Sequence, residues 1–188
     1  MEAGVRGRPR SAEVDERILR VTLDHLRAGG YRELSMEQVA ADAGVGKATV
    51  YRRYRNKADL ATAAVARVSA AKLAGPPPED TREALIDHAR RFESGVAHVG
   101  LGVIASLLEE RDGEALRLHR ERTISHGRER ALSILRRARE RGEIRADADL
   151  DAATQMLFGS LLARRLIGDE GGDWPETVVA TLLRGLAR

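Results

Sequence analysis

The chain has 188 residues, of which 43% are hydrophobic and only 3% aromatic, and it contains no cysteine. This composition can fill a folded core, and it excludes disulfides, thiolate metal sites and thiol nucleophiles. The formal net charge of +3 excludes little, because acidic and basic residues alternate through most of the chain. No stretch approaches the roughly 20 apolar residues that span a bilayer, and residues 1–10 lack the apolar core of a signal peptide. We therefore expect a cytoplasmic protein that makes no membrane contact.

Strand-forming residues never cluster in alternating runs, so the sequence predicts an all-α fold of about nine helices. The chain begins with a basic stretch in which Arg6, Arg8 and Arg10 alternate with glycine and proline. Such a stretch cannot bury one face, so residues 1–10 are expected to form a disordered arm that contacts an anionic partner. A solvated tail without a partner is the alternative.

A first helix is expected between Ser11 and the pair Gly29-Gly30. Ser35, with Gln38 three residues later, forms a capping box at the start of a second, short helix. Gly44 ends that helix, and only a tight turn separates it from the next helical segment. Two short helices joined in this way form a helix-turn-helix, in which the first helix braces the second in the major groove of DNA.

The second helix of this pair, which begins at Lys47, carries a high density of positive charge. Only Val50 and Tyr54 are spaced to face a core. The other side chains are hydroxyls and cations, which suit DNA phosphate better than a protein surface: Lys47, Thr49, Tyr51, Arg52, Arg53 and Arg55. We expect Arg52, ahead of Arg53, to make the bidentate contact with guanine. A solvated cationic helix without a partner is the alternative.

Residues 35–60 read SMEQVAADAGVGKATVYRRYRNKADL, which resembles the DNA-binding signature of the TetR family of repressors. The resemblance covers roughly residues 12–60 and departs at Gly46, where the family often has serine or threonine, and at Ala48, where it commonly has glycine. It implies a homodimer that represses transcription from a palindromic double-stranded operator and is released by a small hydrophobic effector. The predicted DNA-binding residues are Arg6, Arg8, Arg10, Ser35, Lys47, Ala48, Thr49, Tyr51, Arg52, Arg53, Tyr54 and Lys57.

Prolines after residue 75 mark a break between domains. Residues 11–56 are therefore assigned to the helix-turn-helix domain, 57–75 to a connecting helix that Asn56 caps, and 76–188 to a C-terminal domain. Further helices are expected over residues 81–98, 100–110, 114–141, 149–167 and 175–187. The resemblance implies that this second domain dimerises and binds the effector.

Two apolar stripes in the last two predicted helices suit a four-helix dimer interface. They comprise Leu150, Ala153, Leu157 and Leu161, and then Val178, Val179, Leu182, Leu183 and Leu186. A core within one chain is the alternative. Phe92, Met156 and Phe158 are candidates to line an effector pocket, with ordinary core packing as the alternative. The histidines show no metal-binding spacing, so we expect neither a metal nor a cofactor.

Two other classes of function are alternatives to repression. A DNA-binding activator or architectural protein without an effector would use the same recognition helix. An enzyme on a helical bundle is the more remote alternative, because the sequence contains no nucleophile elbow, phosphate loop or paired-carboxylate site. We expect no catalytic activity.

Overall fold

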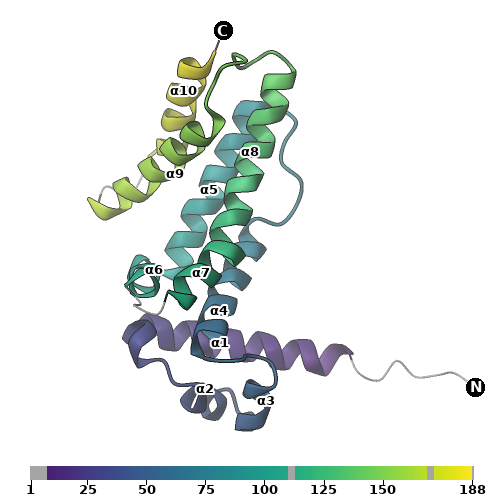
Figure 1. The fold of residues 1–188 in the computed structure, drawn as a ribbon, viewed down its shortest axis with the longest axis vertical. Helices are drawn as coiled ribbons and strands as arrows, with labels where there is room; N and C mark the ends of the chain where they lie inside the picture. The colour runs from purple at the N-terminus through teal and green to yellow at the C-terminus, as the bar shows by residue number, and fades with distance from the viewer. Residues whose placement is uncertain (1–7, 110–112, 169–171, 188) are drawn as a thin grey trace, which may run out of the picture. The chain divides into compact units, whose positions relative to one another are not determined.

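The computed structural model describes residues 8–109, 113–168 and 172–187 (Figure 1). Regular structure in these ranges is entirely helical. The helices are α1 (Arg8–Glu33), α2 (Met36–Asp42), α3 (Lys47–Tyr51), α4 (Lys57–Lys72), α5 (Thr81–Val99), α6 (Leu101–Leu108), α7 (Glu114–His119), α8 (Ser125–Glu140), α9 (Leu150–Leu166) and α10 (Trp174–Leu186). A π-helical turn, Arg120–Ile124, joins α7 to α8 without a break, as expected for one helix over 114–141. Because α7 and α8 are continuous, the ten α-helical segments in the described ranges form nine helices. This confirms the predicted fold class.

The first helix begins earlier than the sequence predicts. It starts at Arg8, so Arg8 and Arg10 belong to its first turn and not to a disordered arm. Pro9 does not prevent this, because a proline in the first turn of a helix removes no hydrogen bond. Arg6 lies outside the described residues.

Gly30 kinks α1, which was predicted to end at Gly29-Gly30 but continues to Glu33. Its backbone angles, φ 70° and ψ −174°, interrupt the helix before a last turn that ends at Glu33. This positive φ favours glycine over any residue with a Cβ. The kink places Tyr31 so that its backbone N–H donates to the Ser106 hydroxyl of α6 at 3.1 Å.

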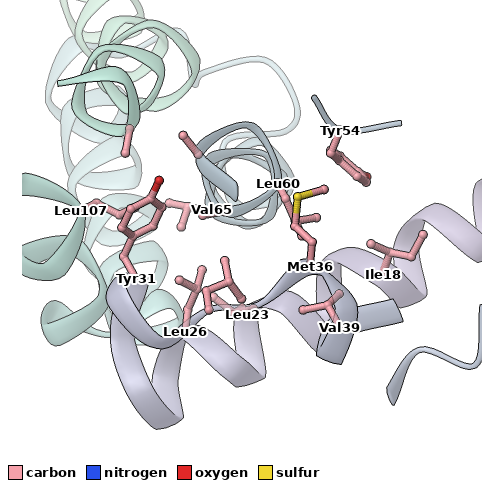
Figure 2. Close-up of a cluster of buried hydrophobic side chains, with 14 of the residues drawn as sticks. Ile18, Leu23, Leu26, Tyr31, Met36, Val39, Tyr54, Leu60, Val65 and Leu107 are labelled. Atoms are coloured by element: carbon pink, nitrogen blue, oxygen red, sulfur yellow. The ribbon is translucent and has the colours of Figure 1, made fainter. Parts of the chain in front are cut away.

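The chain forms two compact units, and the first contains α1 to α4 up to Ser69 together with Ala97–Thr123. Its apolar core is shown in Figure 2, where Ile18, Leu26, Val39, Leu60 and Leu107 are at most 1% exposed. Because α6 supplies part of this core, the unit draws on chain from both sides of the boundary predicted at residue 76.

The second unit contains Ala70–Val96 and the chain from Ile124 onward, and α9 packs against both α8 and α10. Its core includes six residues that were predicted for the dimer interface: Leu150, Ala153, Leu157, Leu161, Val179 and Leu186. Val178, Leu182 and Leu183 pack against the same core from partly buried positions. Six of the nine side chains therefore lie in the core of one chain, as in the alternative interpretation, whereas Val178, Leu182 and Leu183 stay partly exposed and their place in a dimer interface stays a prediction.

In the described part of the chain, none of the helices combines the length and apolar character needed to cross a membrane.

Candidate nucleic-acid interface

The bracing helix α2 is capped as the sequence predicts. The Ser35 hydroxyl accepts a hydrogen bond from the backbone N–H of Gln38 at 3.4 Å. Met36 and Val39 are buried and hold α2 against the core of the first unit. Gly44 has a φ of 61°, which allows the sharp turn toward the next helix. A capped, well-packed helix is what a helix-turn-helix needs to present its second helix rigidly.

Helix α3 presents cations to solvent and only one residue to the core. Val50 is fully buried, whereas Lys47, Ala48, Tyr51 and Arg52 are exposed. Neither Lys47 nor Arg52 has a hydrogen bond or an ion pair with any residue that the structure describes. One ammonium group at the start of α3 and one guanidinium group at its C-terminal cap therefore lack partners within the described part of the protein. Such a pair of cations suits an external polyanion.

Tyr51, the exposed tyrosine of α3, is held by a carboxylate that the sequence analysis missed. Its hydroxyl donates to Glu37 Oε1 at 2.6 Å. This hydrogen bond is the main reason why the pKa of Glu37 is lowered and the pKa of Tyr51 is raised. The signal for Glu37 was its position, one residue into α2, where its side chain can reach the neighbouring helix.

Two residues predicted to bind DNA, Arg53 and Tyr54, instead face α1. The carboxylate of Asp15 accepts from Arg53 Nε at 3.0 Å and from the Tyr54 hydroxyl at 3.2 Å. Tyr54 is only 7% exposed, and burial, followed by the charge of Asp15, raises its pKa. A carboxylate on α1 thus gathers both side chains, which serve to position the end of α3.

Lys57, predicted to bind phosphate, is also engaged within the protein. Its Nζ donates to the backbone carbonyl of Arg32 at 3.1 Å and lies 4.7 Å from the centre of the Tyr31 ring. These contacts tie the start of α4 to the end of α1, and Lys57 would have to leave them to reach DNA.

The start of α4 is fixed by a polar network centred on Asp59. Asn56 caps the helix as predicted, since its Oδ1 accepts from the backbone N–H of Asp59 at 2.9 Å. The Asp59 carboxylate accepts from the backbone N–H of Arg55 at 2.9 Å and from Arg122 Nη2 at 2.5 Å. Burial alone would raise the pKa of Asp59, but these hydrogen bonds outweigh it and lower that pKa. The network joins the segment after α3 to the π-helical turn.

Of the three predicted effector residues, two lie together. The ring centres of Phe92 and Phe158 are 4.8 Å apart, and the His88 ring meets Phe158 edge-on at 5.4 Å. Met156 is 65% exposed and does not join them. His88 is fully buried with Nε2 3.0 Å from the Gly127 carbonyl, and burial above all lowers its pKa to about 4. Among the described residues, no three His, Cys, Asp or Glu side chains cluster so as to hold a metal ion.

A capped short helix, a tight turn and a second short helix with an exposed cationic face define a helix-turn-helix DNA-binding protein. Two family models agree with this class. The model described as "Bacterial regulatory proteins, tetR family" matches residues 18–64, and "Tetracyclin repressor-like, C-terminal domain" matches residues 76–184.

Individual relatives are also DNA-binding transcriptional regulators. An uncharacterized HTH-type transcriptional regulator of Mycobacterium bovis is 32% identical over 85% of this chain and 77% of its own length. The DNA-binding transcriptional repressor TetR of Mycobacteroides abscessus is 47% identical over 60 residues, which are 32% of this chain and 30% of the repressor.

Solved structures share the fold. A TetR-family transcription regulator is 29% identical and has a TM-score of 0.72 over 94% of this chain and 100% of its own. The regulator FadR of Bacillus subtilis, solved in complex with stearoyl-CoA, is 20% identical with a TM-score of 0.64 over 91% of this chain and 96% of its own. The chain belongs to the TetR family of DNA-binding transcriptional regulators.

Proposed function

We propose that this chain is a cytoplasmic repressor that binds a palindromic operator as a homodimer and leaves it when a small molecule binds. The exposed cationic face of α3 carries the proposal. On DNA, Lys47 at the helix start contacts phosphate and Arg52 reaches guanine in the major groove. The Tyr51 hydroxyl leaves Glu37 and donates to the phosphate backbone instead. Repression is the role named for the DNA-binding repressor that shares 60 residues with this chain, and an activator would use the same recognition helix.

The dimer interface is proposed on a different face of α9 from the one that the apolar stripes suggested. Three large apolar side chains there are strongly exposed: Met156 by 65%, Leu166 by 70% and Ile167 by 77%. Leu166 and Ile167 adjoin each other at the end of α9, and apolar side chains exposed together suit an interaction surface. A second copy of the chain is the occupant that a two-fold operator requires, since an isologous interface uses one face twice.

The effector is proposed to be a small hydrophobic molecule that binds near the Phe92–Phe158 pair. The buried Nδ1 of His88, beside Phe158, has no hydrogen-bond partner among the described residues and would serve as a polar anchor. FadR, which shares the fold, was solved with an acyl-CoA bound. A molecule that binds more tightly to the conformation unable to reach both half-sites would shift the dimer away from DNA.

Fluorescence anisotropy with duplex fragments from the region upstream of the gene tests the proposal. Wild-type protein should bind tightly, with an affinity that falls steeply with salt, and footprinting should reveal an inverted repeat. Arg52→Ala should weaken binding at least tenfold, whereas the exposed Arg139→Ala on α8 should leave it unchanged. The proposal fails if the wild type ignores these duplexes at low ionic strength. A promoter reporter that becomes less active when the gene is removed would identify an activator instead.

A further inference from the structure

The second unit contains a pocket of about 420 Å³ that lies away from the Phe92–Phe158 pair. It is lined by Pro77, Pro78, Glu79, Thr81, Ala84, Ile134, Arg137 and Arg141. Ala84 precedes Phe92 by eight residues on α5, which is about 12 Å along the helix axis. We propose that this pocket binds a small organic carboxylate with an apolar body, independently of the effector site proposed above.

The apolar part of such a ligand has a matching wall. Pro77 and Pro78 line the pocket together with Ala84 of α5 and Ile134 of α8. Ala84 and Ile134 are 2% and 3% exposed, so they offer the pocket a small apolar patch backed by the core. A volume of this size lies in the range of small-molecule sites.

Two arginines supply the charge complementarity. Arg137 lines the pocket without a hydrogen bond or ion pair to any described residue, so its guanidinium is available to a ligand. Arg141 is held in place, with Nη2 donating to the Thr81 hydroxyl at 2.5 Å and Nε to Glu143 at 2.6 Å. The planar guanidinium fork is well suited to a carboxylate. Glu79 in the lining opposes an anion and Glu143 already pairs with Arg141, so Arg137 is the cation left for a ligand carboxylate.

The segment that leads into Pro77 and Pro78 is fastened to both helices before any ligand binds. Arg91 of α5 donates to the backbone carbonyls of Lys72 at 3.1 Å and Ala74 at 2.9 Å. Arg130 of α8 donates to the carbonyl of Gly75 at 2.9 Å. Three hydrogen bonds to the residues just before the prolines restrict this segment, which lowers the ordering cost of binding a small ligand.

Titration of the full-length protein with phenylacetate, followed by NMR chemical-shift changes, tests the inference. Phenylacetate should bind with a dissociation constant of roughly 1 mM and perturb Ala84 and Ile134, while neutral phenylacetamide should bind at least fivefold more weakly. Arg137→Gln should weaken phenylacetate binding about fivefold to tenfold. Arg139→Gln is the matched control, because this exposed arginine of the same helix does not line the pocket.

Glu79→Gln tests whether the pocket prefers a simple anion or a ligand that also carries a positive charge for Glu79 to bind. Removing the carboxylate should tighten phenylacetate binding about twofold, because it removes a repulsive charge. The inference is overturned if phenylacetate and phenylacetamide bind equally, if Arg137→Gln behaves like Arg139→Gln, or if Glu79→Gln weakens binding. Operator affinity, measured on the same samples without phenylacetate, reports on the proposed function separately.

Discussion

The guanidinium of Arg122, in the π-helical turn, lies 2.5 Å from the carboxylate of Asp59 in the first turn of α4. The Asp59 side chain is only 9% exposed, and its second oxygen accepts from the backbone N–H that follows α3. One buried carboxylate thus fixes both the start of α4 and the exit from the recognition helix. π-Helical turns often occur at functional positions, and here the turn supplies the cation of this pair.

Breaking this pair should destabilise the protein strongly. Arg122→Gln removes the positive charge that compensates the buried carboxylate of Asp59. The free energy of unfolding should therefore fall by about 2–4 kcal/mol in urea titrations. The control is Arg117→Gln, which breaks an exposed ion pair with Glu121 and should change stability by less than about 0.5 kcal/mol. Equal losses in the two variants would contradict the central role of Asp59.

Removing the Glu37 carboxylate should strengthen DNA binding. Glu37 holds the Tyr51 hydroxyl and places a negative charge beside the exposed cations of α3. Glu37→Gln should raise duplex affinity about threefold at moderate salt, because less charge repels the phosphates. Tyr51→Phe should lower it about fivefold through loss of a hydroxyl donor. Anisotropy titrations would contradict this account if Glu37→Gln weakened binding, since Glu37 would then act by positioning Tyr51.

Mild acid should destabilise the protein through His88. Its folded pKa of about 4 lies below the 6.5 of an ordinary histidine, so between these values the unfolded chain binds a proton that the folded chain does not. Stability therefore falls as the pH drops below about 6.5, by roughly 2 kcal/mol at pH 5 relative to pH 7.5. In His88→Gln the stability difference between these two pH values should shrink by that amount. The exposed His126→Gln serves as the comparison, and an equal change in it would refute the assignment to His88.

Two glycine substitutions in the first unit should have opposite signs. Gly30→Ala forces a side chain into a φ of 70° and brings a Cβ to 3.4 Å from Ser106 Cβ, so unfolding free energy should drop by roughly 1–2 kcal/mol. Gly102→Ala, in α6, meets no atom within 4 Å and should stabilise by roughly 0.5–1 kcal/mol. Thermal melts that move in the same direction for both would refute the role of backbone conformation at Gly30.

A charge on the exposed face of α9 should dissociate the proposed dimer. Met156→Glu should raise the dimer dissociation constant at least tenfold in analytical ultracentrifugation, because the partner copy would bury an unpaired carboxylate. His126→Glu introduces the same side chain at an exposed position of α8 and should have little effect. A dimer that tolerates Met156→Glu would place the interface elsewhere.

The sequence by itself determined the helices and the DNA-binding motif, because the signals involved are local. The Ser35 cap, the turn at Gly44 and the cap at Asn56 each act over three or four residues, and the structure has each of them. Gly30 also interrupts α1 where the helix was predicted to end, although the helix continues past it to Glu33.

Only the tertiary structure decided which face of each helix meets which partner. The stripe from Leu150 to Leu161 is apolar whether it packs inside one chain or against another, so periodicity could not separate the two. Asp15 turns Arg53 and Tyr54 toward α1 from 38 and 39 residues away, and Arg122 reaches Asp59 across 63. Such pairs depend on how distant segments pack, which no local pattern encodes.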